Sequence, residues 1–386
     1  MTTAVDSTTP STTRQAEFAA AYQANVAAGR PPYWHVHIHT LGELDWIMTQ
    51  RGWSGNVDEL NQIQRATQDE YIVVADLRDA NFSGAQLVNA KLIGADLSRA
   101  FFLGADLTGA QLVDSNLSYA RLRMANLNGA NLQNATMTLV HGRRATFAGA
   151  NLTFASLQGA RLSQTDLRGA RLVGAHLDAA TILSEAQFDE RTQLADVIWN
   201  GALLTRIAWD NVKRLGDEDF NLTRGTKRGV VVEGIRNAAR AYNGLAGALK
   251  EQGLAIPASR FRLRAQVLER RALRKDRQYV NWLGSAILDA VAGYGERAGR
   301  AFVAYVSMVL GFAAAYFFVG QAAGPALSPL GAFIFSITSF HGRGFFPGTL
   351  TALDGPFPAV AAAEAVVGLF IELVFIATFS RRFLGN

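Results

Sequence analysis

A small residue and a large apolar residue recur at a spacing of five along residues 75–184. The units read ADLRD, ANFSG, AQLVN, AKLIG and ADLSR, and most have a small residue first and Leu or Phe third. A period of five fits neither the 3.6 of a helix nor the 2 of a strand, so the chain must turn at every unit. If four units make one turn, Leu and Phe point inward and the alanines fill the remaining interior. The pattern therefore predicts a stack of about five to six coils.

These units resemble the repeats of the pentapeptide-repeat family. The resemblance implies a right-handed quadrilateral β-helix, which is an all-β fold, over residues 75–210. The pattern slips at Val140, His141 and Gly142, where we expect a bulge or loop at one corner. After Ile182 the register of the units moves by one.

The charge of the repeats limits the class of partner. Some members of the family mimic DNA with an acidic surface, but residues 75–184 carry ten Lys and Arg against seven Asp. That sign is wrong for mimicry. The formal net charge of the whole chain, +5, is too small to indicate binding to nucleic acid. A cytoplasmic protein remains the candidate partner of the repeats.

The first segment before the repeats is largely polar, and the second combines apolar and polar residues. Residues 1–32 predict a disordered tail, and residues 33–74 predict an N-terminal cap made of a short strand and a helix. Thr40 followed by Glu43 has the spacing of a capping box at the start of that helix.

Three histidines lie in the predicted strand of the cap. His35, His37 and His39 alternate with other residues, which places them on one face of the strand. Such a face can bind zinc or nickel, or it is only a polar strand face. We expect no cofactor, and the absence of cysteine excludes disulfides and thiolate metal sites.

Helical periodicity follows the repeats. Residues 211–276 predict a helical hairpin connector that breaks at Gly253–Pro257. Residues 277–299 predict an amphipathic helix at a membrane interface, because basic residues flank an apolar side that includes Trp282.

Two long apolar segments lie near the C-terminus. Residues 301–320 carry no charge, and residues 357–379 are interrupted only by Glu364 and Glu372. Each is long enough to cross a hydrocarbon core of about 30 Å. Basic residues flank the outer ends, whereas the connection has Arg343 as its only Lys or Arg. The positive-inside rule then predicts a multi-pass protein of the cell (inner) membrane, with both termini and the repeats in the cytoplasm.

The connection between the two apolar segments has the features of a pore loop. Ser328 and Pro329 are start signals for a short helix over 328–339. Residues 300–383 resemble the two-transmembrane pore module of the bacterial potassium-channel superfamily, which implies a homotetramer that conducts inorganic ions across a lipid bilayer. The resemblance places a selectivity filter over 339–345. Its residues depart from the T-V-G-Y-G of the family, so strict potassium selectivity is not expected; they are Ser339, Phe340, His341, Gly342, Arg343 and Gly344.

Two interpretations of Arg343 stay open. In one, Arg343 pairs with Glu364 behind the filter, because a charge inside a membrane needs a partner. In the other, a ring of Arg343, with His341, faces the ions and favours anions. Glu372 shares a helix face with Gly368, and we expect Glu372 to face the pore or a neighbouring subunit. Gly368 is either a gating hinge or a close-packing position.

Together these patterns predict a tetrameric, cation-conducting membrane channel with an unusual filter and a cytoplasmic repeat domain that regulates or assembles it. An anion-selective channel and a non-conducting, membrane-tethered interaction scaffold are the alternatives. An enzyme is not expected, because the sequence has no paired nucleophile and base and no glycine-rich phosphate loop with a lysine.

Overall fold

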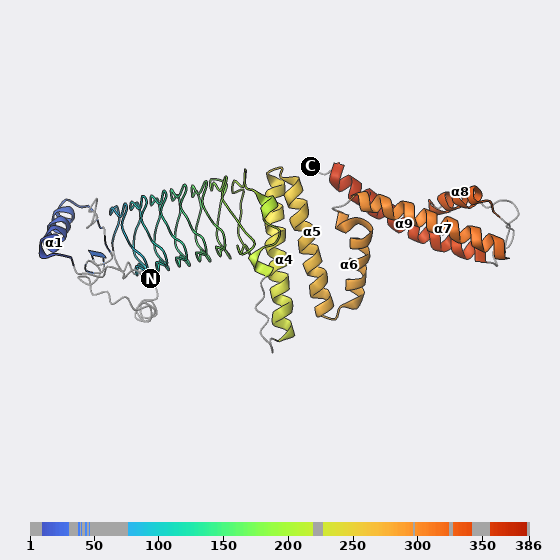
Figure 1. Cartoon of the computed structure of the whole chain (residues 1–386), viewed down its shortest axis with the longest axis horizontal. Helices are drawn as coiled ribbons and strands as arrows, with labels where there is room; N and C mark the ends of the chain where they lie inside the picture. Colours follow the sequence, from blue (N-terminus) through green and yellow to red (C-terminus); the bar gives the residue numbers. More distant parts are fainter. Residues whose placement is uncertain are drawn as a thin grey trace, which may run out of the picture. The chain divides into compact units, whose positions relative to one another are not determined.

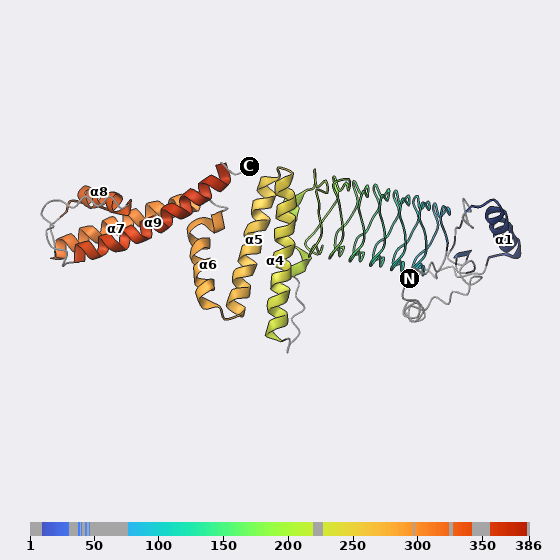
Figure 2. The same ribbon diagram turned by 180° about the vertical axis from the view of Figure 1, so that it is seen from behind.

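The computed structural model describes residues 10–30, 38, 40, 43, 44, 46, 76–218, 227–295, 298–323, 327–341 and 356–383. The chain divides into two compact units, Met1–Leu268 and Glu269–Asn386. Figures 1 and 2 show the repeats as a stack of similar coils, followed along the chain by helices.

The coils repeat every 20 residues over most of the stack. Isolated parallel bridges join residues 20 apart, from Asp76 with Asp96 to Ser156 with His176. One turn therefore holds four units, as the resemblance to pentapeptide repeats implies. The backbone N–H of each inward residue donates to the next coil, as from Leu77 to the carbonyl oxygen of Asp96 at 2.8 Å.

The interior of the stack is filled by the small and large residues of the repeat. The alanines and inward Leu and Phe are buried, and the rings of Phe82 and Phe102 stack with centroids 4.8 Å apart. The expected bulge at Val140–Gly142 is wrong, because His141 continues the bridges to Arg121 and Arg161. A Cβ at Gly142 would lie 2.8 Å from Leu162 Cδ2, so Leu162 of the next coil occupies the space that Gly142 leaves.

The all-β fold class, a right-handed quadrilateral β-helix, is wrong for this chain. No described residue lies in a β-strand; each repeat contributes one bridging residue and a turn, and every named element in the described ranges is a helix. The reason lies in the backbone pairing. Each unit pairs one residue with the neighbouring coil and then turns, so single bridges do not grow into strands.

A register shift is present, but the first one lies just before Ile182 and not after it as predicted, and a second one follows. Ile182 bridges Arg161, 21 residues earlier, and Gln193 bridges Arg171, 22 residues earlier. The inserted residues bring Thr181 into the interior, where its hydroxyl donates to the carbonyl oxygen of Leu157 at 2.9 Å.

The N-terminal segment differs from the predicted tail over residues 1–32. Residues Thr12–Ala27 form α1, which Ser11 caps by accepting the N–H of Arg14. Phe18 of α1 is buried and stacks on Trp46, which gives this helix a packing partner.

Part of the predicted cap is described. The backbone N–H of Glu43 donates to Thr40 Oγ1 at 3.2 Å, as the capping box predicts. Thr40 bridges Gln86, and the N–H of Ile38 donates to the carbonyl oxygen of Asn81 at 2.9 Å, so this segment pairs with the first coil. The predicted histidine face, His35, His37 and His39, lies outside the described residues.

Helices close the other end of the stack. They are η1 (Trp209–Asn211), η2 (Gly216–Glu218), α4 (Arg228–Glu251) and α5 (Ala255–Lys275). Gln252 provides hydrogen-bond partners for two backbone groups of the last coil. Its Oε1 accepts from Leu204 N at 2.8 Å, and its Nε2 donates to the carbonyl oxygen of Ala202 at 2.6 Å. The hairpin breaks earlier than predicted, since Pro257 lies in the first turn of α5, where a proline N–H is not needed.

Two acidic residues of η2 anchor this closure. Asp217 accepts the N–H groups of Leu194 and Ala195 at 2.7 and 2.9 Å, and burial raises the pKa of Asp217 to about 6. Burial opposes ionisation of Glu218 as well, but hydrogen bonds from Arg264 and Tyr242 outweigh it and lower the pKa of Glu218.

We expect Asp217 to contribute more to the stability of the first unit at mildly acidic than at neutral pH. An unfolded Asp titrates near pH 4, so the raised pKa adds stability that is complete below about pH 4 and is lost as the pH rises through about 6. The full change is about 3 kcal/mol. Thermal unfolding at pH 4.5 and 7.5 measures about 2 kcal/mol of this change, and Asp217→Asn should remove this contribution.

Asp210→Asn is the control, because the side chain of Asp210 is 90% exposed. A wild-type chain and an Asp217→Asn variant with the same pH dependence would contradict this prediction.

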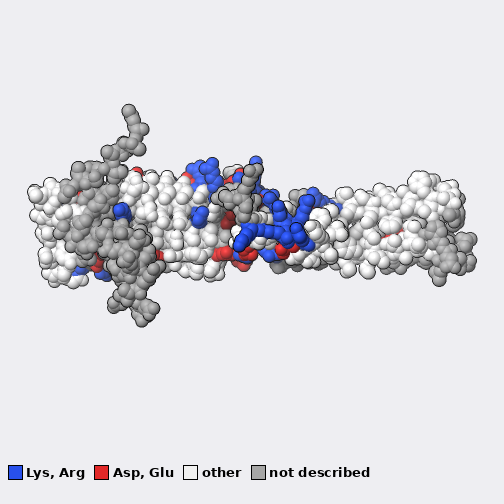
Figure 3. Space-filling view, turned by 90° about the horizontal axis from the view of Figure 1, so that it is seen from below, with Lys and Arg blue, Asp and Glu red and all other residues white. Residues whose placement is uncertain are grey.

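The second unit begins within α5, at Glu269, and continues with α6 (Tyr279–Ala292), η3 (Gly293–Gly295), α7 (Ala298–Ala323), α8 (Pro329–Phe340) and α9 (Pro356–Phe383). These helices cover the predicted interfacial helix, first span, pore helix and second span, with ends that differ by a few residues. Asp289 of α6 pairs with Arg270 at 2.6 Å and with Arg300 of α7 at 3.6 Å. In the view of Figure 3, the visible face of α7, α8 and α9 carries almost no charged side chains.

One helix among the described residues is long and apolar enough to cross a membrane. It is the part of α7 at Gly299–Ala322, with 17% of its most apolar window buried within the chain. By length and composition alone, one such helix is weak evidence of membrane association. The prediction of two spans has no support here, and α9 carries Glu364 and Glu372 within its apolar length.

Candidate functional site

A buried carboxyl group lies at the junction of α7, α8 and α9. Glu364 of α9 is fully buried. Its Oε2 accepts from the hydroxyl of Tyr316 on α7 at 2.7 Å, and its Oε1 lies 2.5 Å from the hydroxyl of Ser336 on α8. The Ser336 hydroxyl also lies 2.9 Å from the carbonyl oxygen of Val309. One carboxyl group thus links all three helices.

Apolar clusters lie on either side of this link. Tyr316, Ala332, Phe335 and Ala361 form one, and Val309, Phe340 and Ile371 form the other. Each cluster takes residues from α7, α8 and α9. The short helix α8 is therefore packed along its length against two long helices.

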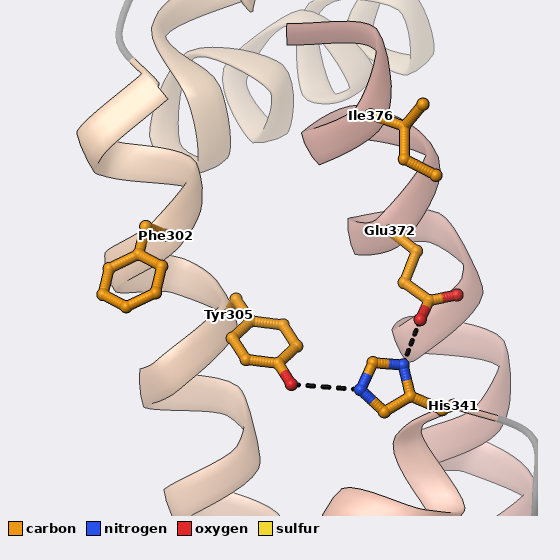
Figure 4. Close-up of a pocket in the computed structure, with 5 residues that line it drawn as sticks. All are labelled: Phe302, Tyr305, His341, Glu372 and Ile376. Atoms are coloured by element: carbon orange, nitrogen blue, oxygen red, sulfur yellow. Dashed lines mark hydrogen bonds and ion pairs between the residues drawn. The ribbon is translucent and has the colours of Figure 1, made fainter. Parts of the chain in front are cut away.

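A second polar chain lies at the C-terminal end of α8. His341 Nδ1 contacts Glu372 Oε1 on α9, and the Tyr305 hydroxyl on α7 lies 3.1 Å from His341 Nε2. Figure 4 shows these three side chains pointing toward one another from three different elements. They line a cavity of about 330 Å³ together with Phe302 and Ile376.

Gly368 lies where α9 approaches the end of α8. A Cβ at this position would lie 3.0 Å from the carbonyl carbon of Phe340 and closer still to its oxygen. Any side chain here would force the two helices apart. Of the two roles predicted for Gly368, this geometry favours close packing.

The predicted filter is described only in part. Ser339 and Phe340 are buried at the end of α8, and His341 is its C-cap residue. Gly342, Arg343 and Gly344 lie outside the described residues, so both interpretations of Arg343 stay predictions. Glu364 lies next to hydroxyl groups, and Glu372 lies next to His341.

Sequence reasoning missed the hydroxyl partners Tyr305, Tyr316 and Ser336. Each is a polar residue inside an otherwise apolar helix, which is the signal that could have marked it. Pairing them with the two glutamates needed the helix packing. For the three N-terminal histidines the structure gives no placement, and within the described ranges no group of three His, Cys, Asp or Glu is arranged to hold a metal.

A family model described as pentapeptide repeats matches residues 75–112, 110–139 and 145–182 in eight copies. The chain contains pentapeptide repeats. The pentapeptide-repeat matches end at residue 182, so they give no support to the potassium-channel resemblance of residues 300–383. No curated protein matches the chain.

Solved structures similar to this chain are also pentapeptide-repeat proteins. One is from the thylakoid lumen of Arabidopsis thaliana, with 31% identity over 26% of this chain and 64% of that one, and a TM-score of 0.17. Another is HetL, which is involved in heterocyst differentiation regulation in the cyanobacterium Nostoc sp. strain PCC 7120. It is 24% identical over 43% of this chain and 99% of HetL, with a TM-score of 0.16. This chain spans just under two thirds of the length of the Arabidopsis thaliana protein. TM-scores this low add nothing to the family match.

Proposed function

We propose that this pentapeptide-repeat protein is an oligomeric membrane ion channel that conducts cations through a pore built from α7, α8, α9 and the segment after α8. The observation that carries the proposal is the position of α8. It is a 12-residue apolar helix, too short to cross a bilayer, and it packs against both long helices. A short helix held in this way is what a re-entrant pore requires.

Electrostatics supports cations as the permeant ions. The C-terminal end of α8, at Phe340 and His341, carries the negative end of the helix dipole. Glu372 adds a carboxylate beside His341. Both raise the local concentration of cations where the filter begins.

The number of subunits and the membrane topology in this proposal rest on the sequence alone. The resemblance to two-transmembrane pores implies four subunits, and the basic flanks place both termini and the repeats in the cytoplasm. The repeats then regulate the pore or assemble it with a cytoplasmic protein. No step of this proposal needs a cofactor.

The reversal potential in planar bilayers under a KCl gradient tests the proposal. We expect purified wild-type chain to conduct, with a reversal potential near the potassium equilibrium potential. Arg343→Gln separates the two roles of Arg343: silence or misfolding of the variant fits a brace behind the filter, and a changed reversal potential fits a position that faces the ions.

Two outcomes would contradict it. A wild-type reversal potential near the chloride equilibrium potential that moves toward zero in Arg343→Gln would mean an anion channel lined by Arg343. No conductance from wild-type chain of verified fold would leave the membrane-tethered scaffold.

A further inference from the structure

One face of the coil stack concentrates positive charge. Arg121, His141 and Arg161 bridge one another in consecutive coils, so their side chains form a column. Arg123, Arg143 and Arg144 follow in the same units. All six side chains are exposed, and we call them the cationic face; they are Arg121, Arg123, His141, Arg143, Arg144 and Arg161.

Several arginines elsewhere in the stack pair with carboxylates, whereas among the described residues those of this face do not. Arg78 pairs with Asp76 at 2.7 Å, Arg99 with Asp79 at 2.6 Å, and Arg168 with Asp166 at 2.6 Å. No ion pair within the described ranges includes a residue of the cationic face. Its described contacts are to neutral groups: the Gln164 amide oxygen accepts from Arg143 and Arg144, and Arg121 lies 4.7 Å from the Phe101 ring centroid.

This arrangement costs stability, because like charges are held about 4.8 Å apart on successive coils. His141 is affected directly: burial lowers its pKa, and Arg161 and Arg121 lower it further. At neutral pH the positive charge therefore comes from the five arginines. Glu185 attracts Arg143 electrostatically but forms no ion pair with the face. A repulsive array that no ion pair within the described residues neutralises is what a face for an anionic partner needs.

Apolar side chains lie beside these charges. In the same column of units, Leu103 is 50% and Met124 is 56% exposed. Cations interleaved with apolar side chains on a flat surface are typical of contact with lipid headgroups, where the charge meets phosphate and the apolar group enters the interface.

We propose that the cationic face docks on a bilayer surface that contains anionic lipids. The inference rests on the membrane association of the proposed function, since α7 would tether the coil close to such a surface and raise its effective concentration there. An acidic protein segment is the competing partner, and the flat mixture of charge and apolar surface favours the bilayer.

The test uses energy transfer from single labels on the full chain to acceptor lipids in reconstituted vesicles. The chain has no cysteine, so Met124→Cys and Phe154→Cys each carry one fluorophore. Met124 lies on the cationic face; Phe154 follows Asn151 in the column of units half a turn away and is equally exposed, at 57%. The vesicles contain phosphatidylcholine with or without phosphatidylserine.

We expect more transfer from position 124 than from position 154 only when phosphatidylserine is present, and loss of that difference at high salt. A triple variant should abolish the difference; it carries Arg121→Gln, Arg143→Gln and Arg161→Gln. The loss of three charges should weaken the binding of the face to the anionic surface roughly 100-fold. The matched control replaces Arg78, Arg99 and Arg168 by Gln, which removes the same charge from paired positions, and should keep the difference.

Equal transfer from both positions with phosphatidylserine would overturn the inference. So would a difference that persists in pure phosphatidylcholine or in the triple variant of the cationic face. A triple variant that loses binding of labelled polyglutamate while the vesicle signal is unchanged would point instead to an acidic protein. Ion flux measured in the same vesicles separates this inference from the channel proposal, because either readout can fail alone.

Discussion

Gly368→Ala should destabilise the second unit by about 3 kcal/mol or more. The added methyl group would meet the carbonyl group of Phe340, which belongs to helix backbone and cannot move as a side chain can. To relieve the clash, α9 must shift away from α8, and the cluster of Val309, Phe340 and Ile371 would open. Thermal unfolding of the detergent-solubilised chain measures the effect.

Gly311→Ala in α7 is the matched control. A Cβ at Gly311 would meet no atom within 4 Å, so this substitution should leave the unfolding midpoint unchanged or slightly higher. The two variants add the same methyl group to a long apolar helix, and only the surroundings differ. Equal midpoints for both variants would mean that α9 does not approach Phe340 as closely as described.

The period of five was enough to predict a chain that turns at every unit, because burial of one large residue per unit fixes how often the chain must turn. Four units to a coil came from the resemblance to pentapeptide repeats. It was not enough to predict the fold class. Whether bridges extend into strands depends on backbone pairing at two successive residues, and the residue pattern does not encode it. Gly142 illustrates the same limit, since only the neighbouring coil shows that Leu162 fills its space.

The helices of the second unit were predicted closely, because apolar length and the Ser328 and Pro329 start signal are local properties. The polar partners were not. Sequence reasoning identified Glu364 as a buried charge that needs a partner, but it looked for an opposite charge. The structure places two hydroxyl groups there, from helices 48 and 28 residues away in the chain.

Those hydroxyl groups bear on the protonation of Glu364. The Ser336 hydroxyl has one hydrogen but lies within hydrogen-bond distance of two oxygens, Val309 O and Glu364 Oε1. A proton on Glu364 Oε1 removes the conflict: it is donated to Ser336 Oγ, Ser336 donates to Val309, and Tyr316 donates to Oε2. A neutral carboxyl group also costs far less to bury in apolar surroundings than a carboxylate does.

Glu364→Gln should therefore leave the fold nearly unchanged, whereas Glu364→Ala should cost about 3 kcal/mol. The amide of Gln can donate to Ser336 and accept from Tyr316, as the protonated acid does. Alanine leaves the Tyr316 hydroxyl without this acceptor and opens a gap among α7, α8 and α9. Unfolding midpoints in detergent for the two variants and wild type measure both effects.

A Gln variant as damaged as the Ala variant would mean that Glu364 is ionised and that a positive charge neutralises it, which would return Arg343 to the role of its partner. Near-native stability of the Gln variant would instead free Arg343 from that role. The conductance of the same Gln variant would then show whether the pore depends on a charge at this position at all.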